Sequence, residues 1–173
     1  MINDGNNRSF CLKMQFFCSQ ILLFGFRYAI LYKNELEIFM NNRPSESELN
    51  FVRDALKRYN DAQVGDDGHT PLHFVEYDHD GNLIGGIIGG TYWGWLYIDI
   101  LWVDERYRRL GIGSKLLAAA ENEAKRRRCH HVHVDTMSWQ APLFYKKHGY
   151  EIIGILPDIP TGHQKYLLCK SLL

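Results

Sequence analysis

Apolar and polar positions follow a regular order from residue 34 to the end of the chain, and they predict one α/β domain. Runs of strand type alternate with segments in which apolar residues recur at helical spacing. The expected order is β-α-β-β-β-α-β-α-β-β, an α/β or α+β arrangement on a mixed sheet. The expected strands are residues 35–40, 72–78, 83–92, 93–103, 130–135, 150–156 and 165–172, and the helices are 45–59, a segment ending near 128, and 140–148.

The first helix has a clear start signal at Ser45. Ser45 and Glu48 have the spacing of a capping box, in which each residue satisfies a free backbone N–H of the other. Apolar residues follow at helical spacing, so we expect one side of this helix to be buried. They are Leu49, Val52, Leu56 and Tyr59.

Residues 72–92 predict a hairpin around the turn sequence DHDGN. The returning strand, LIGGIIGGTY, contains four glycines. Glycine weakens a strand unless a bulge or a closely approaching group requires it, so we expect such a feature here. The next strand, within residues 93–103, is apolar on both faces and is expected at the centre of the sheet.

Residues 1–33 differ from the rest and are interpreted as an N-terminal apolar extension before a domain at residues 34–173. Their apolar run is interrupted by Ser19, Gln20 and Arg27, so it is too short and too broken to predict a membrane span. No cleavage site typical of a signal peptide follows it. A packed or interface helix, a poorly ordered extension and a membrane anchor all remain open.

Composition limits the class of partner and the compartment. The chain of 173 residues has 20 basic and 20 acidic side chains, so no overall charge favours nucleic acid. Its four cysteines form no CxxC pair, which favours a reducing, cytoplasmic location over a zinc site or a disulfide framework.

The stretch RYRRLGIGSKLL (residues 106–117) carries the strongest chemical signal. A strand that runs through a glycine turn into a helix presents free backbone N–H groups at the positive end of the helix dipole. Gly111 and Gly113 allow a ligand to approach the backbone, and Arg108 and Arg109 add positive charge. These features predict a pyrophosphate site. The helix itself is expected to bury Leu116, Leu117, Ala120 and Ala124.

Two common phosphate motifs do not fit this stretch. A Walker A loop requires Gly-Lys-Ser/Thr, and the dinucleotide fingerprint requires a third glycine where Leu116 stands. Arg-x-x-Gly-x-Gly at Arg108–Gly113 instead resembles the acyl-CoA signature of the GNAT N-acetyltransferase superfamily. The segments APLFYKKHGY and PTGHQKYL are similar to a small bacterial group of that superfamily. The resemblance extends over residues 35–173 and implies a mixed, mostly antiparallel central sheet flanked by helices.

The resemblance also implies a CoA site. Backbone N–H groups of the motif would hold the pyrophosphate, and the strand before it would splay from its neighbour and pair with the pantetheine arm. Ser138 stands where the family often has a CoA-binding asparagine. The implied cofactor-binding residues are Leu101, Trp102, Val103, Arg108, Arg109, Leu110, Gly111, Ile112, Gly113, Ser114 and Ser138.

The implied reaction is direct attack of a primary amine on acetyl-CoA in a ternary complex, without a metal. Tyr145 matches the family's tyrosine, which protonates the departing thiolate. An amine with a pKa near 10.4 is almost fully protonated at about pH 7, so a base is needed. Asp99, Glu76 and ordered water are the candidates, and a purely structural role for Asp99 in the sheet remains open.

Aromatic and basic groups elsewhere allow further interpretations. Tyr92, Trp93 and Trp95 are predicted to line a pocket for a small-molecule amine acceptor, or else they are core. His131, His133 and Asp135 alternate on one strand face, which favours a half-exposed sheet face over a metal site. The run of basic residues 125–128 is typical of a helix C-terminus.

Two other functions are alternatives to acetyl transfer. A non-catalytic acyl-CoA sensor or scaffold would use the same fold, and a nucleotide- or nucleic-acid-binding module would use the arginines and the basic run. A homodimer through the C-terminal strands or the N-terminal apolar segment is also compatible with the sequence. The acceptor amine itself is not specified.

Overall fold

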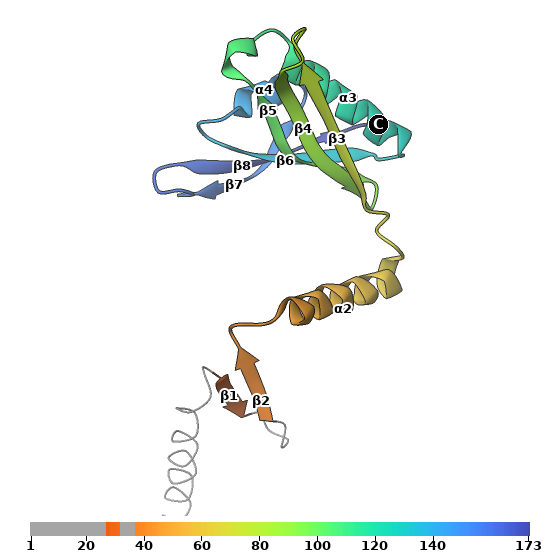
Figure 1. The fold of residues 1–173 in the computed structure, drawn as a ribbon, viewed down its shortest axis with the longest axis vertical. Helices are drawn as coiled ribbons and strands as arrows, with labels where there is room; N and C mark the ends of the chain where they lie inside the picture. Colours follow the sequence, from red (N-terminus) through yellow and green to blue (C-terminus); the bar gives the residue numbers. More distant parts are fainter. Residues whose placement is uncertain (1–26, 32–36) are drawn as a thin grey trace, which may run out of the picture. The chain divides into compact units, whose positions relative to one another are not determined.

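The computed structural model describes residues 27–31 and 37–173, with side chains from Met40 onward (Figure 1). The chain forms two compact units, Met1–Asn60 and Asp61–Leu173. The described part of the first unit begins with β1 (Arg27–Leu31), which pairs antiparallel with β2 (Glu37–Asn41). β1 falls within the predicted N-terminal extension. The rest of that extension lies outside the described residues, so its role and the predicted domain boundary stay predictions.

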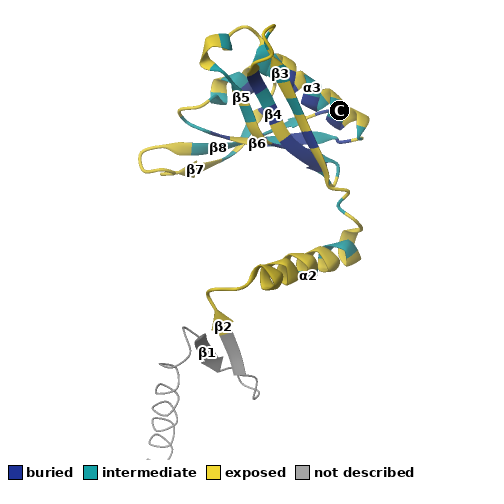
Figure 2. Ribbon diagram, viewed as in Figure 1, coloured by how far each residue is buried: buried dark blue, intermediate teal, exposed yellow. Residues whose placement is uncertain are grey.

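Helix α2 (Glu46–Val64) begins as the capping box predicts. The backbone N–H of Glu48 donates to Oγ of Ser45 over 3.3 Å, and the N–H of Ser45 donates to Oε2 of Glu48 over 2.6 Å. The expected burial of its apolar side is wrong, because no residue of α2 is buried (Figure 2). In the described part of its own unit only a two-stranded ribbon accompanies the helix, too little to cover that side.

The second unit is built on a six-stranded sheet in the order β3-β4-β5-β6-β8-β7. The β5–β6 pair is parallel and the other four pairs are antiparallel, which confirms the mixed, mostly antiparallel sheet. The elements are β3 (Thr70–Tyr77), β4 (Leu83–Tyr92), β5 (Trp95–Val103), a 3-10 turn η1 (Glu105–Tyr107), α3 (Ile112–Arg126), β6 (His131–Met137), α4 (Pro142–Lys147), β7 (Glu151–Pro157) and β8 (Gln164–Ser171).

The core lies between α3 and one face of this sheet. The four residues of α3 that the sequence predicts to be buried are buried: Leu116, Leu117, Ala120 and Ala124. They pack in one cluster with apolar residues from the strands, including Leu72, Ile87, Leu96, Val132 and Leu168. β5 stands third in the sheet, so its predicted central position is confirmed.

A bulge in β5 explains two of the glycines in β4. Ile88 lies opposite Ile100 and Gly89 lies opposite Ile98, so Asp99 is an extra residue in β5. A Cβ atom at Gly89 would collide with the carbonyl oxygen of Tyr97, and one at Gly90 would lie 2.8 Å from the Tyr97 hydroxyl. The glycines therefore permit the bulge and the Tyr97 ring beside it, as the sequence predicts.

The sheet opens between β5 and β6 directly after this bulge. The parallel pairing joins Trp95–Ile98 to His131–Val134 and stops there. β6 continues beside β8 to Met137, and β5 continues beside β4 to Val103. Figure 1 shows β7 and β8 diverging from β3 and β4. We call the opening between residues 99–103 of β5 and 135–137 of β6 the β5–β6 split.

Candidate functional site

The turn from β5 into α3 presents a run of free backbone donors. None of the N–H groups from Arg109 to Ser114 donates a hydrogen bond to another described residue, and the first such bond in α3 runs from Lys115 N to Gly111 O over 2.9 Å. The run lies at the N-terminus of a helix of 15 residues, where the dipole favours an anion. We call residues Arg109–Ser114 the phosphate cradle.

Two left-handed residues shape the cradle. Gly111 has φ of 86° and Arg109 has φ of 65°. Glycine adopts this conformation without steric cost, whereas residues with a Cβ rarely do. The position of a Cβ at Gly111 is open, with no heavy atom within 4 Å among its described neighbours, so the backbone here is accessible. The arrangement fits a diphosphate, as the sequence predicts.

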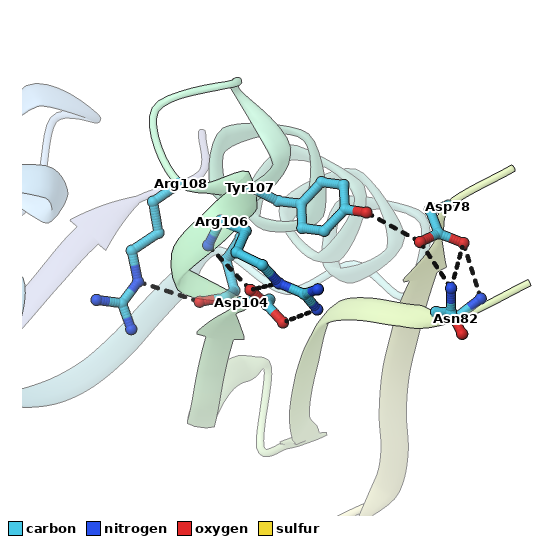
Figure 3. A network of polar contacts seen from close by, with 7 residues as sticks. Asp78, Asn82, Asp104, Arg106, Tyr107 and Arg108 are labelled. Atoms are coloured by element: carbon cyan, nitrogen blue, oxygen red, sulfur yellow. Dashed lines mark hydrogen bonds and ion pairs between the residues drawn. The ribbon is translucent and has the colours of Figure 1, made fainter. Parts of the chain in front are cut away.

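A polar network holds the approach to the cradle (Figure 3). The hydroxyl of Tyr107 donates to Oδ2 of Asp78 over 2.9 Å, and Asn82 donates to both oxygens of the same carboxylate. These bonds hold the pKa of Asp78 at about 2, and the bond from the Asn82 side chain contributes most. The turn before the cradle is thus fixed to the β3–β4 hairpin.

The predicted arginines differ in their availability. Nε of Arg108 donates to the carbonyl oxygen of Val103 over 3.1 Å (Figure 3). Its Nη1 lies 3.4 Å from Oε1 of Glu105. Arg108 is therefore a brace between the turn and the end of β5 in this structure. Arg109 is exposed beside the cradle. Of the two guanidinium groups, that of Arg109 is the better placed to meet an anion from solvent.

Leu101, Trp102 and Val103 lie where the family resemblance requires an open strand edge. They pair with Ile87, Gly86 and Gly85 of β4, and no described residue of β6 lies opposite them. Alternate backbone groups of this segment therefore point into the β5–β6 split. An extended ligand arm could form hydrogen bonds to them.

Tyr145 occupies α4, on the buried side of the sheet. Its ring is 5% exposed and packs edge-on against Tyr150 at 5.5 Å between centroids. Burial, with a smaller contribution from the charge of Asp135 in β6, raises the pKa of Tyr145 to about 12. The phenol therefore stays protonated at neutral pH, the state that a proton donor requires.

The two candidate carboxylates lie on different elements. Asp99 is the exposed bulge residue of β5 at the start of the β5–β6 split. Glu76 in β3 is 2.6 Å from Nζ of Lys115, the first residue after the cradle. The ion pair gives Glu76 a structural partner, whereas Asp99 has no ion-pair partner within the described part of the chain.

Three rings beside Asp99 form an aromatic wall: Tyr92, Tyr97 and His133. The Tyr92 hydroxyl lies 3.3 Å from Nε2 of His133, and the Tyr97 ring stacks on His133 at 6.2 Å. Burial lowers the pKa of His133, although Asp135 and Asp99 act in the opposite direction. Burial raises the pKa of Tyr97, and Asp99 adds to that shift. His133 is therefore uncharged at neutral pH.

Of the three residues predicted to line the acceptor pocket, Tyr92 belongs to this wall and both tryptophan rings contact it: Trp93 lies 5.8 Å from Tyr92 and Trp95 lies 6.2 Å from His133, centroid to centroid. Trp95 is six residues before Leu101, about 20 Å along an extended strand. It stacks on His131 at 4.7 Å, and Trp93 sits in the turn that connects β4 to β5. The turn borders a cavity of about 340 Å³, at the end of the strands away from the cradle. Tyr92 pairs with Trp95 across the β4–β5 ladder, so the three predicted residues lie together, and their role in binding an acceptor stays a prediction.

Ser138 and Ser114 are both engaged with histidines. Oγ of Ser138 lies 3.3 Å from Nδ1 of His163, and Oγ of Ser114 lies 2.9 Å from Nε2 of His148. The sequence pattern did not indicate His148, Tyr97 or His163 as site residues. Tyr97 could have been found from its place two residues before Asp99, but the histidine contacts join segments 25 and 34 residues apart and give no local signal.

Two further expectations concern metals and membranes. Within residues 27–31 and 37–173, no group of three or more histidine, cysteine or acidic side chains is arranged to hold a metal ion. In the same part of the chain, no helix combines the length and apolar character that a membrane crossing demands.

The chain is similar to known acetyltransferases. The model of the acetyltransferase (GNAT) family matches residues 31–150. The blasticidin-S acetyltransferase of Streptomyces morookaense is 43% identical over 93 residues, which cover 53% of this chain and 68% of that protein. A crystal structure of an acetyltransferase from Bacillus cereus ATCC 14579 has a TM-score of 0.72 and 34% identity, covering 76% of this chain and 96% of that one.

A third relative was solved with a ligand. This acetyltransferase from Bacillus anthracis str. Ames, in complex with acetyl coenzyme A, is 26% identical with a TM-score of 0.53, covering 58% of this chain and 62% of that one. The family match extends over most of the second unit and includes β5, the cradle, α3 and α4. The chain belongs to the GNAT acetyltransferase family.

Proposed function

We propose that this protein is a cytoplasmic N-acetyltransferase that moves an acetyl group from acetyl-CoA to a primary amine of a small molecule or peptide. The observation that carries the proposal is the phosphate cradle with its unbroken run of free N–H groups, at the end of a strand whose edge is open. A diphosphate fits the first feature and an extended arm fits the second. The acetyl-CoA bound to the Bacillus anthracis relative supports this cosubstrate.

The residues of this chain have separate roles in binding. Backbone groups of Arg109–Ser114 hold the diphosphate, with Arg109 adding charge. Backbone groups of Leu101–Val103 hold the arm in the β5–β6 split. The side chain of Arg108 donates to the carbonyl oxygen of Val103, so it ties the turn before the cradle to the end of β5. This bond keeps the diphosphate site and the arm site aligned with each other.

The residues around the split carry out the proton transfers. Asp99 accepts a proton from the ammonium form of the acceptor, which leaves the neutral amine able to attack. As the new C–N bond forms and the C–S bond breaks, Tyr145 donates its phenolic proton to the departing sulfur. The attacking nitrogen then loses its second proton, which passes through water to the tyrosinate and restores the phenol, and Asp99 releases its proton to solvent. Asp99 is preferred over Glu76 as the base, because Glu76 is committed to Lys115.

The acceptor site is assigned to the aromatic wall beside Asp99. Tyr92, Tyr97 and the neutral His133 present ring faces and edges, which suit a cationic group held beside a carboxylate. The relative that acetylates blasticidin S supports a small-molecule amine. Blasticidin S is accordingly the first acceptor to test.

The test combines calorimetric binding of acetyl-CoA with thiol release in the presence of blasticidin S. We expect wild-type protein to bind acetyl-CoA, and Tyr145→Phe to bind it equally while kcat falls by about 10²–10³. Tyr77→Phe, an exposed tyrosine of β3, is the matched control and should keep full activity. Absence of acetyl-CoA binding to wild-type protein would contradict the proposal. Equal turnover by Tyr145→Phe would remove Tyr145 from the mechanism.

A further inference from the structure

His148 links the phosphate cradle to helix α4 through both nitrogens of its ring. Nδ1 lies 2.8 Å from the carbonyl oxygen of Phe144, and Nε2 lies 2.9 Å from Oγ of Ser114. A carbonyl oxygen only accepts hydrogen bonds, so Nδ1 carries the hydrogen. In the neutral ring Nε2 is then the acceptor, and the hydroxyl of Ser114 donates to it.

The surroundings fix the imidazole in this position. Its ring lies 4.4 Å from the ring of Phe144, centroid to centroid, and it is half-buried where α4 ends. Gly113, next to Ser114, faces the same phenyl ring, and a Cβ there would lie 3.5 Å from it. The first turn of α3 and the last turn of α4 therefore meet at His148.

The bond from Ser114 to His148 has a consequence for an anion in the cradle. Ser114 contributes a free backbone N–H, but its hydroxyl hydrogen is committed to the neutral imidazole. When the ring takes up a second proton, Nε2 becomes a donor to Oγ of Ser114. The hydroxyl hydrogen is then released to an anionic oxygen, and a positive charge stands one hydroxyl group away from it.

The charges near His148 are mostly of one sign. The ionisable groups of the turns that meet around it are basic, apart from the Tyr145 phenol and the acidic partners Glu76 and Glu105 of Lys115 and Arg108. Lys170 of β8 packs beside Gly149 and is paired with Glu121, which also accepts a bond from Tyr150. An anion in the cradle brings a charge of the opposite sign to this group of residues. These basic groups are Arg108, Arg109, Lys115, Lys146 and Lys147.

We infer that His148 takes up a proton when a diphosphate binds the phosphate cradle, which makes the diphosphate ligand (acetyl-CoA, under the proposed function) bind more tightly as the pH falls. His148 is thus a positioning residue for the cosubstrate that acts through Ser114. The identity of the natural ligand rests on the proposed function, but the proton linkage rests only on the contacts of His148 and on an anion in the cradle.

Calorimetry in several buffers tests the inference, because the dependence of the binding enthalpy on the ionisation enthalpy of the buffer counts the protons taken up. Acetyl-CoA is titrated into wild-type protein and His148→Gln, whose amide can still bond Ser114 but does not titrate. The phosphates of acetyl-CoA contribute equally to both. We expect wild-type protein to take up more protons. The Kd of wild-type protein for acetyl-CoA should also be larger at about pH 8 than at about pH 6, and the ratio of the two values should exceed the same ratio for His148→Gln by about threefold or more.

Two further variants separate a structural effect from proton linkage. Ser114→Ala keeps the imidazole and removes the relay, so it should also lose the extra proton uptake. His79→Gln, at an exposed histidine of the β3–β4 turn, should behave as wild-type protein does. Equal proton uptake by wild-type protein, His148→Gln and Ser114→Ala would overturn the inference.

Inorganic pyrophosphate, titrated in the same way, distinguishes the two proposals. Binding of pyrophosphate with His148-dependent proton uptake, but without binding of acetyl-CoA, would overturn the proposed function and support the inference. Binding of acetyl-CoA without the linkage would overturn only the inference. Failure of wild-type protein to bind either ligand would overturn both.

Discussion

The phenolic hydroxyl of Tyr107 donates a hydrogen bond of 2.9 Å to Oδ2 of Asp78, which joins the turn before the phosphate cradle to the β3–β4 hairpin. The two residues are 29 positions apart, so the contact is a tertiary brace on a segment that otherwise forms only a short 3-10 turn. The position of the cradle therefore depends on a hairpin that lies outside the cradle.

Tyr107→Phe should weaken this brace. We expect the pKa of Asp78 to rise from about 2 toward 3.8, because one of its hydrogen-bond donors is lost. The affinity for acetyl-CoA should fall several-fold, since the turn into the cradle becomes less ordered. NMR titration of the Asp78 carboxyl and calorimetry of acetyl-CoA binding measure the two effects, and an unchanged Asp78 titration would contradict the brace.

Lowering the pH should destabilise the fold over the range in which the carboxylates of Asp78 and Asp104 take up protons. Hydrogen bonds from Asn82 and Arg106, respectively, hold the pKa of each carboxyl at about 2, below the ordinary 3.8. A carboxyl whose pKa is lower in the folded chain than in the unfolded chain stabilises the fold at any pH above the unfolded-state pKa. This stabilisation is lost as the pH falls through the folded-state pKa of about 2. Denaturant unfolding between about pH 5 and pH 2 should show this loss, and Asp78→Asn should reduce its slope.

Gly111→Ala should affect both stability and binding. An alanine at φ of 86° is strained, and we expect a loss of about 1–2 kcal/mol in the free energy of unfolding. Gly162→Ala is the matched control, because Gly162 has φ of 81° and equally open surroundings in the β7–β8 turn. Both variants should lose similar stability, whereas only Gly111→Ala should weaken acetyl-CoA binding. Equal affinities would contradict the role of the cradle.

His133 should make stability depend on pH near neutrality. Because burial lowers its pKa in the folded state, the unfolded chain binds more protons and the fold is stabilised as the pH rises. The stabilisation from neutral His133 is fully present at a pH above the unfolded-state pKa of about 6.5, and it is lost as the pH falls below that pKa. His133→Gln should flatten the pH dependence of the unfolding free energy in that window. A slope identical to that of wild-type protein would exclude His133 as its source.

A half-buried ion pair should stabilise the packing of α3 on β8. Nζ of Lys170 lies 2.9 Å and 2.7 Å from the two carboxylate oxygens of Glu121, which also accepts a bond from Tyr150. Lys170→Met leaves that carboxylate without its cation, and we expect a loss of about 2 kcal/mol by thermal unfolding. Arg53→Met removes a cation from the exposed pair with Glu46 and should change stability by about 0.5 kcal/mol or less.

Local sequence was sufficient to predict most of the second unit. The buried positions of α3 follow from helical spacing, and the cradle follows from two glycines between a strand and a helix. These signals lie within a few residues of each other, so they need no knowledge of the tertiary fold. The order of elements and the central place of β5 were predicted for the same reason, and both are confirmed.

Features that depend on register could not be predicted. The bulge at Asp99 changes which side chains of β5 share a face, and it is visible only when β4 and β5 are aligned. The contact between Ser114 and His148 requires two helix ends to meet, and no local pattern encodes it.

The β5–β6 split has a consequence for which molecules can bind along β5. An open strand edge at the rim of a sheet is an aggregation hazard, because a strand from another chain can add to it. Here the open edge lies in the interior of the sheet, with β6 diverging on its far side. A protein strand needs a spacing of about 4.8 Å to its partner on each side. β5 and β6 are already paired with each other at Ile98, so no third strand can lie between them there. A thin, flexible chain meets no such obstacle, and the split therefore selects its occupant by cross-section before any chemical group is recognised.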